Sequence, residues 1–112
     1  MCLFCKIVSK EIAGKILFED EHLLAFSDIH PQAPTHALVI PKRHIVSLNE
    51  ATPADAALLG HLVLAAQRVA REAKLADAGW RLVVNNGAAA GQSVFHVHLH
   101  VLGGRQMAWP PG

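Results

Sequence analysis

Three histidines alternate with aliphatic residues near the end of the chain, in the run HVHLHVL over residues 96–102. Apolar residues at every second position predict a β-strand, in which residues two apart lie on the same face. The imidazoles of His96, His98 and His100 therefore share one face, and the aliphatic side chains of the other face pack on a core. This run predicts a fixed row of groups that titrate near neutral pH, which is typical of a functional site.

Length and composition restrict the chain to one small globular unit. It has 112 residues, of which 52% are hydrophobic, so one core can form and we expect one domain over residues 1–112. A net charge of +1 argues against a nucleic-acid partner. The sequence contains neither a signal-peptide pattern nor an apolar run of 18 residues, and its two cysteines cannot form a disulfide framework. We therefore expect a cytoplasmic protein that does not bind membranes.

Periodicity and turn residues predict five strands and two helices. A long helix is expected over 53–77, because Thr52 is a good N-cap, Pro53 suits the first turn and Asp55 lies near the positive end of the helix dipole. The other expected elements are a short helix over 3–12 and strands over 16–19, 23–28, 36–41, 80–85 and 96–102. This order favours an α+β fold, with a five-stranded antiparallel sheet and both helices on one face.

The histidine row is open to three interpretations. It is a solvated strand face, a metal site or a catalytic row. Residues two apart in a strand lie about 6.6 Å apart, which puts His96 and His100 about 13 Å apart. Zinc needs each ligand nitrogen at about 2.0–2.1 Å, so one ion cannot bind all three histidines of a flat strand. The catalytic interpretation makes His98, in the middle, a nucleophile that its neighbours orient.

Other residues suggest what surrounds this row. The small-residue loop Gly91-Gln92-Ser93 precedes it and offers backbone N–H groups to an anion. Asp28 ends an apolar strand, where it either caps a turn or accepts hydrogen bonds from the hydroxyls of a ligand. His36, taken alone, is a core histidine.

Cys2 and Cys5 form a Cys-x-x-Cys pair with three possible roles. They are small residues at the edge of the core, a redox dithiol or half of a zinc site. A zinc site needs two more ligands, and His44 and His96 are candidates that the spacing alone does not select.

The histidine run matches the signature of the histidine triad (HIT) superfamily, in which three histidines alternate with apolar residues. Residues 28–36, 91–95 and 103–112 resemble its histidine triad nucleotide-binding (Hint) branch, and the resemblance extends from Phe4 to the last residue. Two details differ from the most familiar pattern: His30 and Ser27 flank Asp28, and Ala108 precedes Trp109.

This resemblance implies a purine nucleoside phosphoramidate hydrolase that acts on adenosine 5′-phosphoramidates and aminoacyl adenylates. His98 corresponds to the nucleophile, which forms a nucleotidyl-histidine intermediate that water then cleaves. His100 and His36 correspond to groups that orient and stabilise it, and Ser93 to a group near the leaving amine. His96 completes the catalytic triad of histidines.

The resemblance also implies ligands and partners. The expected partners are a purine nucleotide, such as AMP, GMP or an adenosine phosphoramidate, and a second copy of the chain, whose strands continue the sheet in a homodimer. No organic cofactor is expected. A structural zinc ion would be bound by Cys2, Cys5, His44 and His96. Nucleotide contacts are expected from Leu3, Phe4, Ile7, Phe26, Asp28, Ile29, Asn85, Gly91, Gln92, Ser93, His98 and His100.

Two other functions remain open from the sequence. One is hydrolysis of dinucleoside polyphosphates, as in the fragile histidine triad branch, although the tail over residues 103–112 favours Hint. The other is a scaffold that binds nucleotides or protein partners and hydrolyses its ligand only incidentally.

Overall fold

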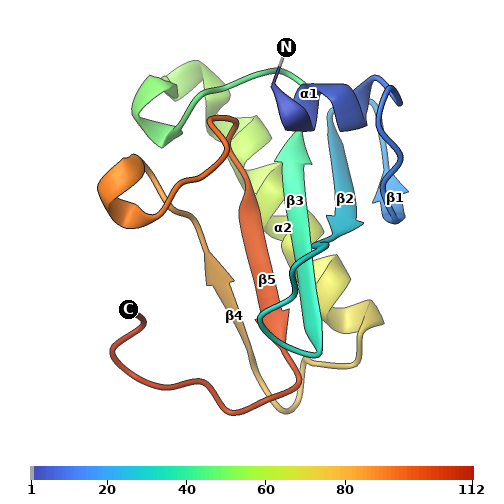
Figure 1. The fold of residues 1–112 in the computed structure, drawn as a ribbon, viewed down its shortest axis with the longest axis vertical. Coiled ribbons are helices and arrows are strands. Elements are labelled where there is room, and N and C mark those ends of the chain that lie inside the picture. The colour runs from blue at the N-terminus through green and yellow to red at the C-terminus, as the bar shows by residue number, and fades with distance from the viewer. Residues whose placement is uncertain (1) are drawn as a thin grey trace.

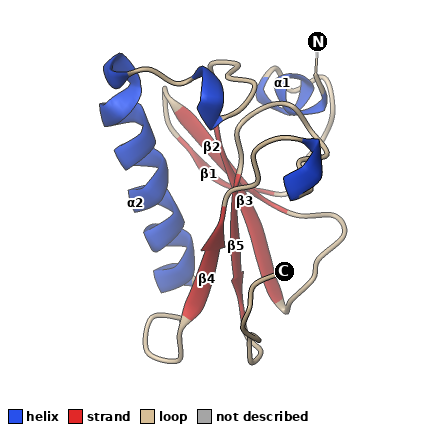
Figure 2. Ribbon diagram, turned by 90° about the vertical axis from the view of Figure 1, so that its left-hand side faces the viewer, coloured by secondary structure: helices blue, strands red, loops and turns tan. Residues whose placement is uncertain are grey.

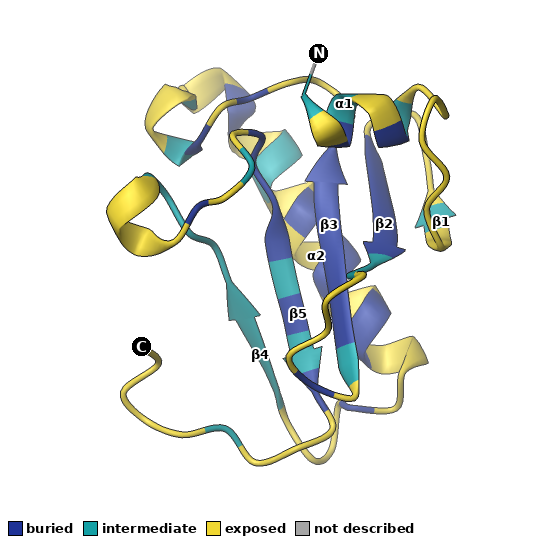
Figure 3. Ribbon diagram, viewed as in Figure 1, coloured by how far each residue is buried: buried dark blue, intermediate teal, exposed yellow. Residues whose placement is uncertain are grey.

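The computed structural model describes residues 2–112, and its strands form one antiparallel sheet (Figure 1). The five strands lie in the order β1-β2-β3-β5-β4, and every neighbouring pair is antiparallel. Their bounds are Ile16–Glu19 for β1, Leu23–Ser27 for β2, Thr35–Pro41 for β3, Trp80–Val83 for β4 and Leu99–Gly103 for β5. This sheet, together with one long and one short helix, confirms the predicted α+β fold. Figure 3 shows β2 and β3 buried and β4 half-buried.

The two helices cover opposite faces of the sheet (Figure 2). Helix α2 (Ala56–Glu72) packs on the face that carries the odd-numbered residues of β3, and helix α1 (Leu3–Val8) packs on the other face. The expectation that both helices share one face is therefore wrong. It fails because the side chains of Phe4 and Ile7 contact the even-numbered residues of β2 and β3, which are Leu24, Phe26, Leu38 and Ile40.

Helix α2 begins and ends inside the predicted range of 53–77. Its first three predicted residues form a 3-10 turn, Pro53–Asp55, and the Thr52 N–H donates to the Asp55 carboxylate at 2.9 Å. The helix ends at Glu72 because Lys74 adopts φ 63°, and the N–H of Leu75 then donates to the Ala70 carbonyl at 2.9 Å. This pattern is a Schellman C-cap. The usual glycine is absent from it, so the sequence did not reveal the end.

The short helix is also shorter than predicted. Helix α1 ends at Val8 rather than at residue 12, because the backbone turns at Lys10, which adopts φ 67°. The Cys2 side chain caps its start by accepting a hydrogen bond from the Cys5 N–H at 3.2 Å. The cysteine pair therefore lies at the start of the helix.

Strand ends shift by one to three residues from their predicted positions. Strand β2 ends at Ser27 rather than at residue 28, β3 begins at Thr35, and β4 ends at Val83 rather than at residue 85. The largest shift is in the histidine run, where β5 begins at Leu99 and not at residue 96. The aliphatic residues of the run still face α2 in the main core, on both sides of this boundary.

Leu62 offers a direct test of this core. It is fully buried in the middle of α2, within the cluster between the helix and the sheet. We expect Leu62→Ala to lower the free energy of unfolding by about 2–5 kcal/mol, because it leaves a cavity. Urea unfolding measures this loss, and Leu64→Ala is the matched control, since Leu64 on the same helix is 61% exposed. An equal loss in both variants would contradict the packing described here.

No helix among residues 2–112 has the length and apolar character that a membrane crossing requires.

Candidate functional site

The ring of His98 has a defined tautomer. His98 lies one residue before β5 and is buried, and its Nδ1 is 2.7 Å from the backbone oxygen of His96. A carbonyl oxygen only accepts hydrogen bonds, so Nδ1 carries the proton and donates it. In the neutral ring, the lone pair is therefore on Nε2. This arrangement presents Nε2 as a nucleophile or a base.

His36 on β3 and His100 on β5 are joined by a hydrogen bond whose direction is also defined. The Gln32 N–H donates to Nδ1 of His36 at 3.0 Å, so in the neutral ring the proton is on Nε2. That Nε2 is 2.9 Å from Nδ1 of His100, to which it donates. His100 is then protonated on Nε2. A backbone amide thus makes the far nitrogen of His100 a hydrogen-bond donor.

Burial keeps both rings of this pair neutral. It is the main cause that lowers the pKa of His36, and it lowers the pKa of His100 to about 4, with further contributions from His98 and His36 nearby. Asp28 opposes both shifts through its negative charge. At neutral pH the pair is therefore uncharged, and the tautomers follow from hydrogen bonding alone.

Asp28 lies at the end of β2, beside this pair. Its Oδ2 is 3.3 Å from Nε2 of His36, and its Oδ1 accepts the His30 N–H at 2.8 Å. The backbone N–H of Asp28 also donates to the His36 carbonyl at 2.9 Å. Both roles considered from the sequence are compatible with this position, because the carboxylate holds the turn and still reaches the edge of the histidine cluster.

The lowered pKa values predict how stability depends on pH. An unfolded histidine binds its proton near pH 6.5, whereas His100 in the folded protein binds one only near pH 4. Between these values the unfolded chain binds more protons, so stability decreases as pH falls from 6.5 towards 4. Urea unfolding across this range measures the decrease. We expect a smaller decrease in His100→Ala, and an unchanged slope would contradict the assigned burial effect.

The loop before the histidine run is held by Gln92. Its buried side chain donates to the carbonyls of Val46 and Val94, at 2.7 and 3.1 Å, and accepts the Gly87 N–H at 2.8 Å. This side chain is therefore engaged within the protein, and so are the backbone N–H groups of Gly91 and Gln92, which donate to the carbonyls of Ala88 and Gly87 at 3.0 and 3.1 Å. Ser93 is exposed, and Gly91 adopts φ 93°. Asn85 lies just after β4 and is half-buried.

The apolar residues expected around a purine fall into two groups. Leu3 and Ile29 are exposed, at 47% and 83%, and are accessible to a ligand. Phe4, Ile7 and Phe26 are almost fully buried in the cluster under α1.

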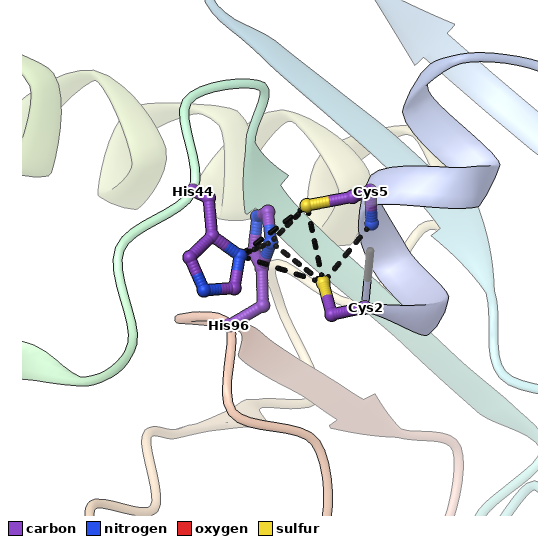
Figure 4. A group of neighbouring side chains, drawn as sticks. All are labelled: Cys2, Cys5, His44 and His96. Atoms are coloured by element: carbon purple, nitrogen blue, oxygen red, sulfur yellow. Dashed lines mark hydrogen bonds between the residues drawn. The ribbon is translucent and has the colours of Figure 1, made fainter.

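The four sulfur and imidazole groups of the expected zinc site lie together (Figure 4). Cys2 and Cys5 come from the start of α1, His44 from the loop after β3, and His96 from the segment before β5. The two Sγ atoms are 3.2 Å apart, the two Nδ1 atoms are 3.1 Å apart, and the sulfur–nitrogen distances are 3.3–3.6 Å. These four ligand atoms form a compact, roughly tetrahedral group.

This group fits a zinc ion. Ligands of a tetrahedral zinc ion lie about 3.3–3.8 Å apart at usual Zn–N and Zn–S lengths, close to the separations found here. His96 also has the required tautomer, because its Nε2 donates to the Pro41 carbonyl at 2.8 Å and leaves the Nδ1 lone pair free to bind. Two cysteines and two histidines are a common structural zinc set.

His96 is separated from the other histidines of the row by its surroundings. It is fully buried, with one nitrogen on Pro41 and the other in the cysteine cluster. Its ring therefore does not reach a ligand, and it meets His98 through its backbone oxygen. The sequence placed His96 in both the catalytic set and the metal set, and the geometry favours the second.

A five-stranded antiparallel sheet, next to which one run supplies His96, His98 and His100, is the architecture of the histidine triad class of proteins. The chain belongs to this family: the HIT domain model matches residues 9–107. An uncharacterized HIT-like protein from Synechocystis is 54% identical over 110 residues, which cover 98% of this chain and 96% of that protein.

Solved structures agree with this assignment. A HIT family hydrolase from Legionella pneumophila is 51% identical, covers all of both chains and gives a TM-score of 0.98. A histidine triad nucleotide-binding protein from Candida albicans is 33% identical, with a TM-score of 0.83 over 98% of this chain and 83% of that one. The chain therefore shares the fold of both a hydrolase and a nucleotide-binding protein.

Proposed function

We propose that the protein is a hydrolase of the Hint type, which cleaves purine nucleoside phosphoramidates and aminoacyl adenylates through a covalent intermediate on His98. One observation carries this proposal: Nδ1 of His98 donates to the His96 carbonyl, so Nε2 is the nitrogen with the free lone pair. The Legionella hydrolase and the Candida nucleotide-binding protein support the class of activity.

The reaction has two displacements at the α-phosphorus. In the first, Nε2 of His98 forms a bond to phosphorus, and the bond from phosphorus to the leaving group breaks. This group is the amine of a phosphoramidate or the carboxylate of an aminoacyl adenylate. An amine takes a proton from solvent as it leaves, and the exposed hydroxyl of Ser93 is our candidate for relaying it. In the second, water attacks phosphorus and loses a proton to solvent, the bond to Nε2 breaks and the nucleoside monophosphate is released. Dividing one displacement into two in this way is the purpose of a covalent nucleophile.

The histidine pair stabilises charge during these steps. His100 presents Nε2–H as a donor, which would bind an oxygen of the phosphoryl group as negative charge accumulates there. His36 holds His100 in that tautomer. Asp28 would accept hydrogen bonds from the ribose hydroxyls. Asn85 and the backbone N–H of Ser93 would bind the phosphate, because the N–H groups of Gly91 and Gln92 already donate to carbonyls of their own loop.

The base would lie against the apolar residues near α1 and the end of β2. Leu3 and Ile29 are exposed there and would contact the purine directly, and the buried rings of Phe4 and Phe26 would support them from beneath, together with Ile7. We propose no organic cofactor. The Cys2–Cys5–His44–His96 group would hold a structural zinc ion, which ties α1 to the loop after β3 and to the histidine segment.

We also propose that two copies form a homodimer with one continuous sheet. Strand β4 is an edge of the sheet, and all four of its residues are only half-buried. An exposed edge of this kind presents unpaired backbone groups that a second copy can pair with. Size-exclusion chromatography with light scattering measures the mass, and a mass of one chain would contradict the dimer.

The substrate class is tested by comparing turnover of an adenosine 5′-phosphoramidate and of diadenosine tetraphosphate by the same preparation. We expect a higher kcat/KM for the phosphoramidate. Faster cleavage of the tetraphosphate would assign the protein to the dinucleoside polyphosphate hydrolases instead. Binding of AMP without cleavage of either compound would favour a scaffold.

A further inference from the structure

The nucleophile proposed above lies in the part of the histidine run that the sheet does not hold. The ladder with β3 pairs Leu99 with Val39 and continues to Gly103, and the ladder with β4 begins at His100. His98 precedes both ladders. The backbone of the segment 96–98 is instead bound to the loop after β3, since the Val97 N–H donates to the Ile45 carbonyl at 2.7 Å. Something other than strand pairing must therefore fix the position of His98.

The cysteine–histidine cluster reaches His98 through His96. Nε2 of His96 donates to the Pro41 carbonyl, and its Nδ1 lies 3.4 and 3.6 Å from the two sulfur atoms. The carbonyl of the same residue accepts the Nδ1–H of His98. A shift of His96 would therefore move the group that sets the orientation and tautomer of His98.

Helix α1 provides a second connection between the cysteine–histidine cluster and His98. Phe4 lies between the two cysteines in the sequence, and its ring contacts His98 edge to face, with centroids 5.0 Å apart. It also contacts His96 at 6.0 Å. The N-terminal helix is only six residues long, and the cysteines join it to His44 and His96. Binding of an ion by the cysteines would therefore hold the Phe4 ring against His98.

We propose that the metal centre at Cys2, Cys5, His44 and His96 positions the His98 ring for attack, in addition to stabilising the fold. Cys5 and His44 are then positioning residues, although neither contacts His98. The inference rests on the proposed function only in taking His98 as the nucleophile. Outer residues that orient a reactive group commonly change activity by 10- to 100-fold when they are removed.

The test uses the full chain with Cys5→Ser and His44→Ala, and with His22→Ala as a control. His22 is exposed and lies outside the cluster. We expect bound zinc to fall from one ion per chain to well below one in the first two variants, and kcat to fall about 10- to 100-fold. KM and the Kd for AMP should change by a smaller factor than kcat, since the proposed ribose and phosphate contacts at Asp28 and Ser93 lie outside helix α1. His44→Cys should restore both zinc and kcat, because three cysteines and one histidine also bind zinc.

A spectroscopic measurement separates positioning from general loss of stability. In ¹⁵N-labelled protein, well below the unfolding temperature, we expect the Nδ1–H signal of His98 in the intact protein and in His22→Ala. The signal should weaken or disappear in Cys5→Ser and His44→Ala while the signals of β2 and β3 amides stay unchanged. This result would support the proposal even if the intact protein cleaved none of the tested substrates, which would overturn only the proposed function. An unchanged His98 signal in zinc-free variants, or full kcat without zinc, would overturn the positioning role.

Discussion

Replacement of His98 with alanine is expected to lower kcat for an adenosine phosphoramidate by about 10⁴-fold or more, which is the usual effect of removing a covalent nucleophile. The free Nε2 of His98 supplies the bond to phosphorus, and no intermediate forms without it. AMP should still bind, because the proposed contacts from Asp28, Asn85 and the Ser93 N–H remain. Steady-state rates and isothermal titration with AMP measure the two effects separately.

His30→Ala is the matched control for His98→Ala. His30 is exposed and contributes its backbone N–H, which alanine keeps, to the Asp28 carboxylate. We expect its kcat within about threefold of the unmodified protein, as for surface substitutions in general. Comparable rates in His98→Ala and His30→Ala would remove His98 from the mechanism.

Replacement of His100 with alanine has the second-largest expected effect. It removes the Nε2–H donor that faces the phosphoryl group, and loss of one such donor typically lowers kcat by about 10²–10³-fold. KM should change little, because the donor acts mainly on charge that develops in the transition state. Pre-steady-state kinetics would show slower formation of the nucleotidyl-His98 intermediate.

The hydrogen bonds of His100 predict that two substitutions at this residue lower kcat to different extents. His100→Gln keeps an N–H donor on a side chain of similar reach, so we expect it to retain more activity than His100→Ala. A rise in KM with unchanged kcat in both variants would place His100 in ground-state binding instead and contradict its role in the transition state.

The sequence predicted all five strands to within three residues. Strands β2, β3 and β5 carry buried aliphatic residues, which make the pattern clear, whereas β1 is mostly exposed and β4 is half-buried. The helix ends were less predictable. Lys10 and Lys74 adopt positive φ, where glycine is the usual signal, so both helices end earlier than their apolar pattern suggests.

The histidine run shows a second limit of prediction from the sequence. Its alternation continues from His96 to Val101, yet the strand covers only the second half. The first half keeps an extended course because His96 binds Pro41 and Val97 binds Ile45, contacts between residues about 50 positions apart that no local pattern contains. The same contacts bring His96 to the cysteines, which spacing alone did not select.

The backbone groups that set the tautomers of the site could not be predicted from the sequence either. The Gln32 N–H sets the direction of the His36–His100 hydrogen bond, and the His96 carbonyl sets the tautomer of His98. Every residue has an N–H or a carbonyl, so residue identity does not indicate which of them matter. The two prolines at positions 31 and 34 do indicate a loop around Gln32. A loop there allows the Gln32 N–H to point back towards β3, but the sequence does not predict that it does.

The central claim is that Nε2 of His98 becomes bonded to phosphorus during turnover, and the most direct measurement is intact mass. The protein is mixed with an excess of adenosine phosphoramidate, quenched rapidly without acid and weighed by mass spectrometry, with fragmentation to locate any adduct. We predict a transient gain of one AMP group per chain, located on His98 and missing from His98→Ala. An adduct on another residue, or turnover in His98→Ala at the rate of the unmodified protein, would contradict the account.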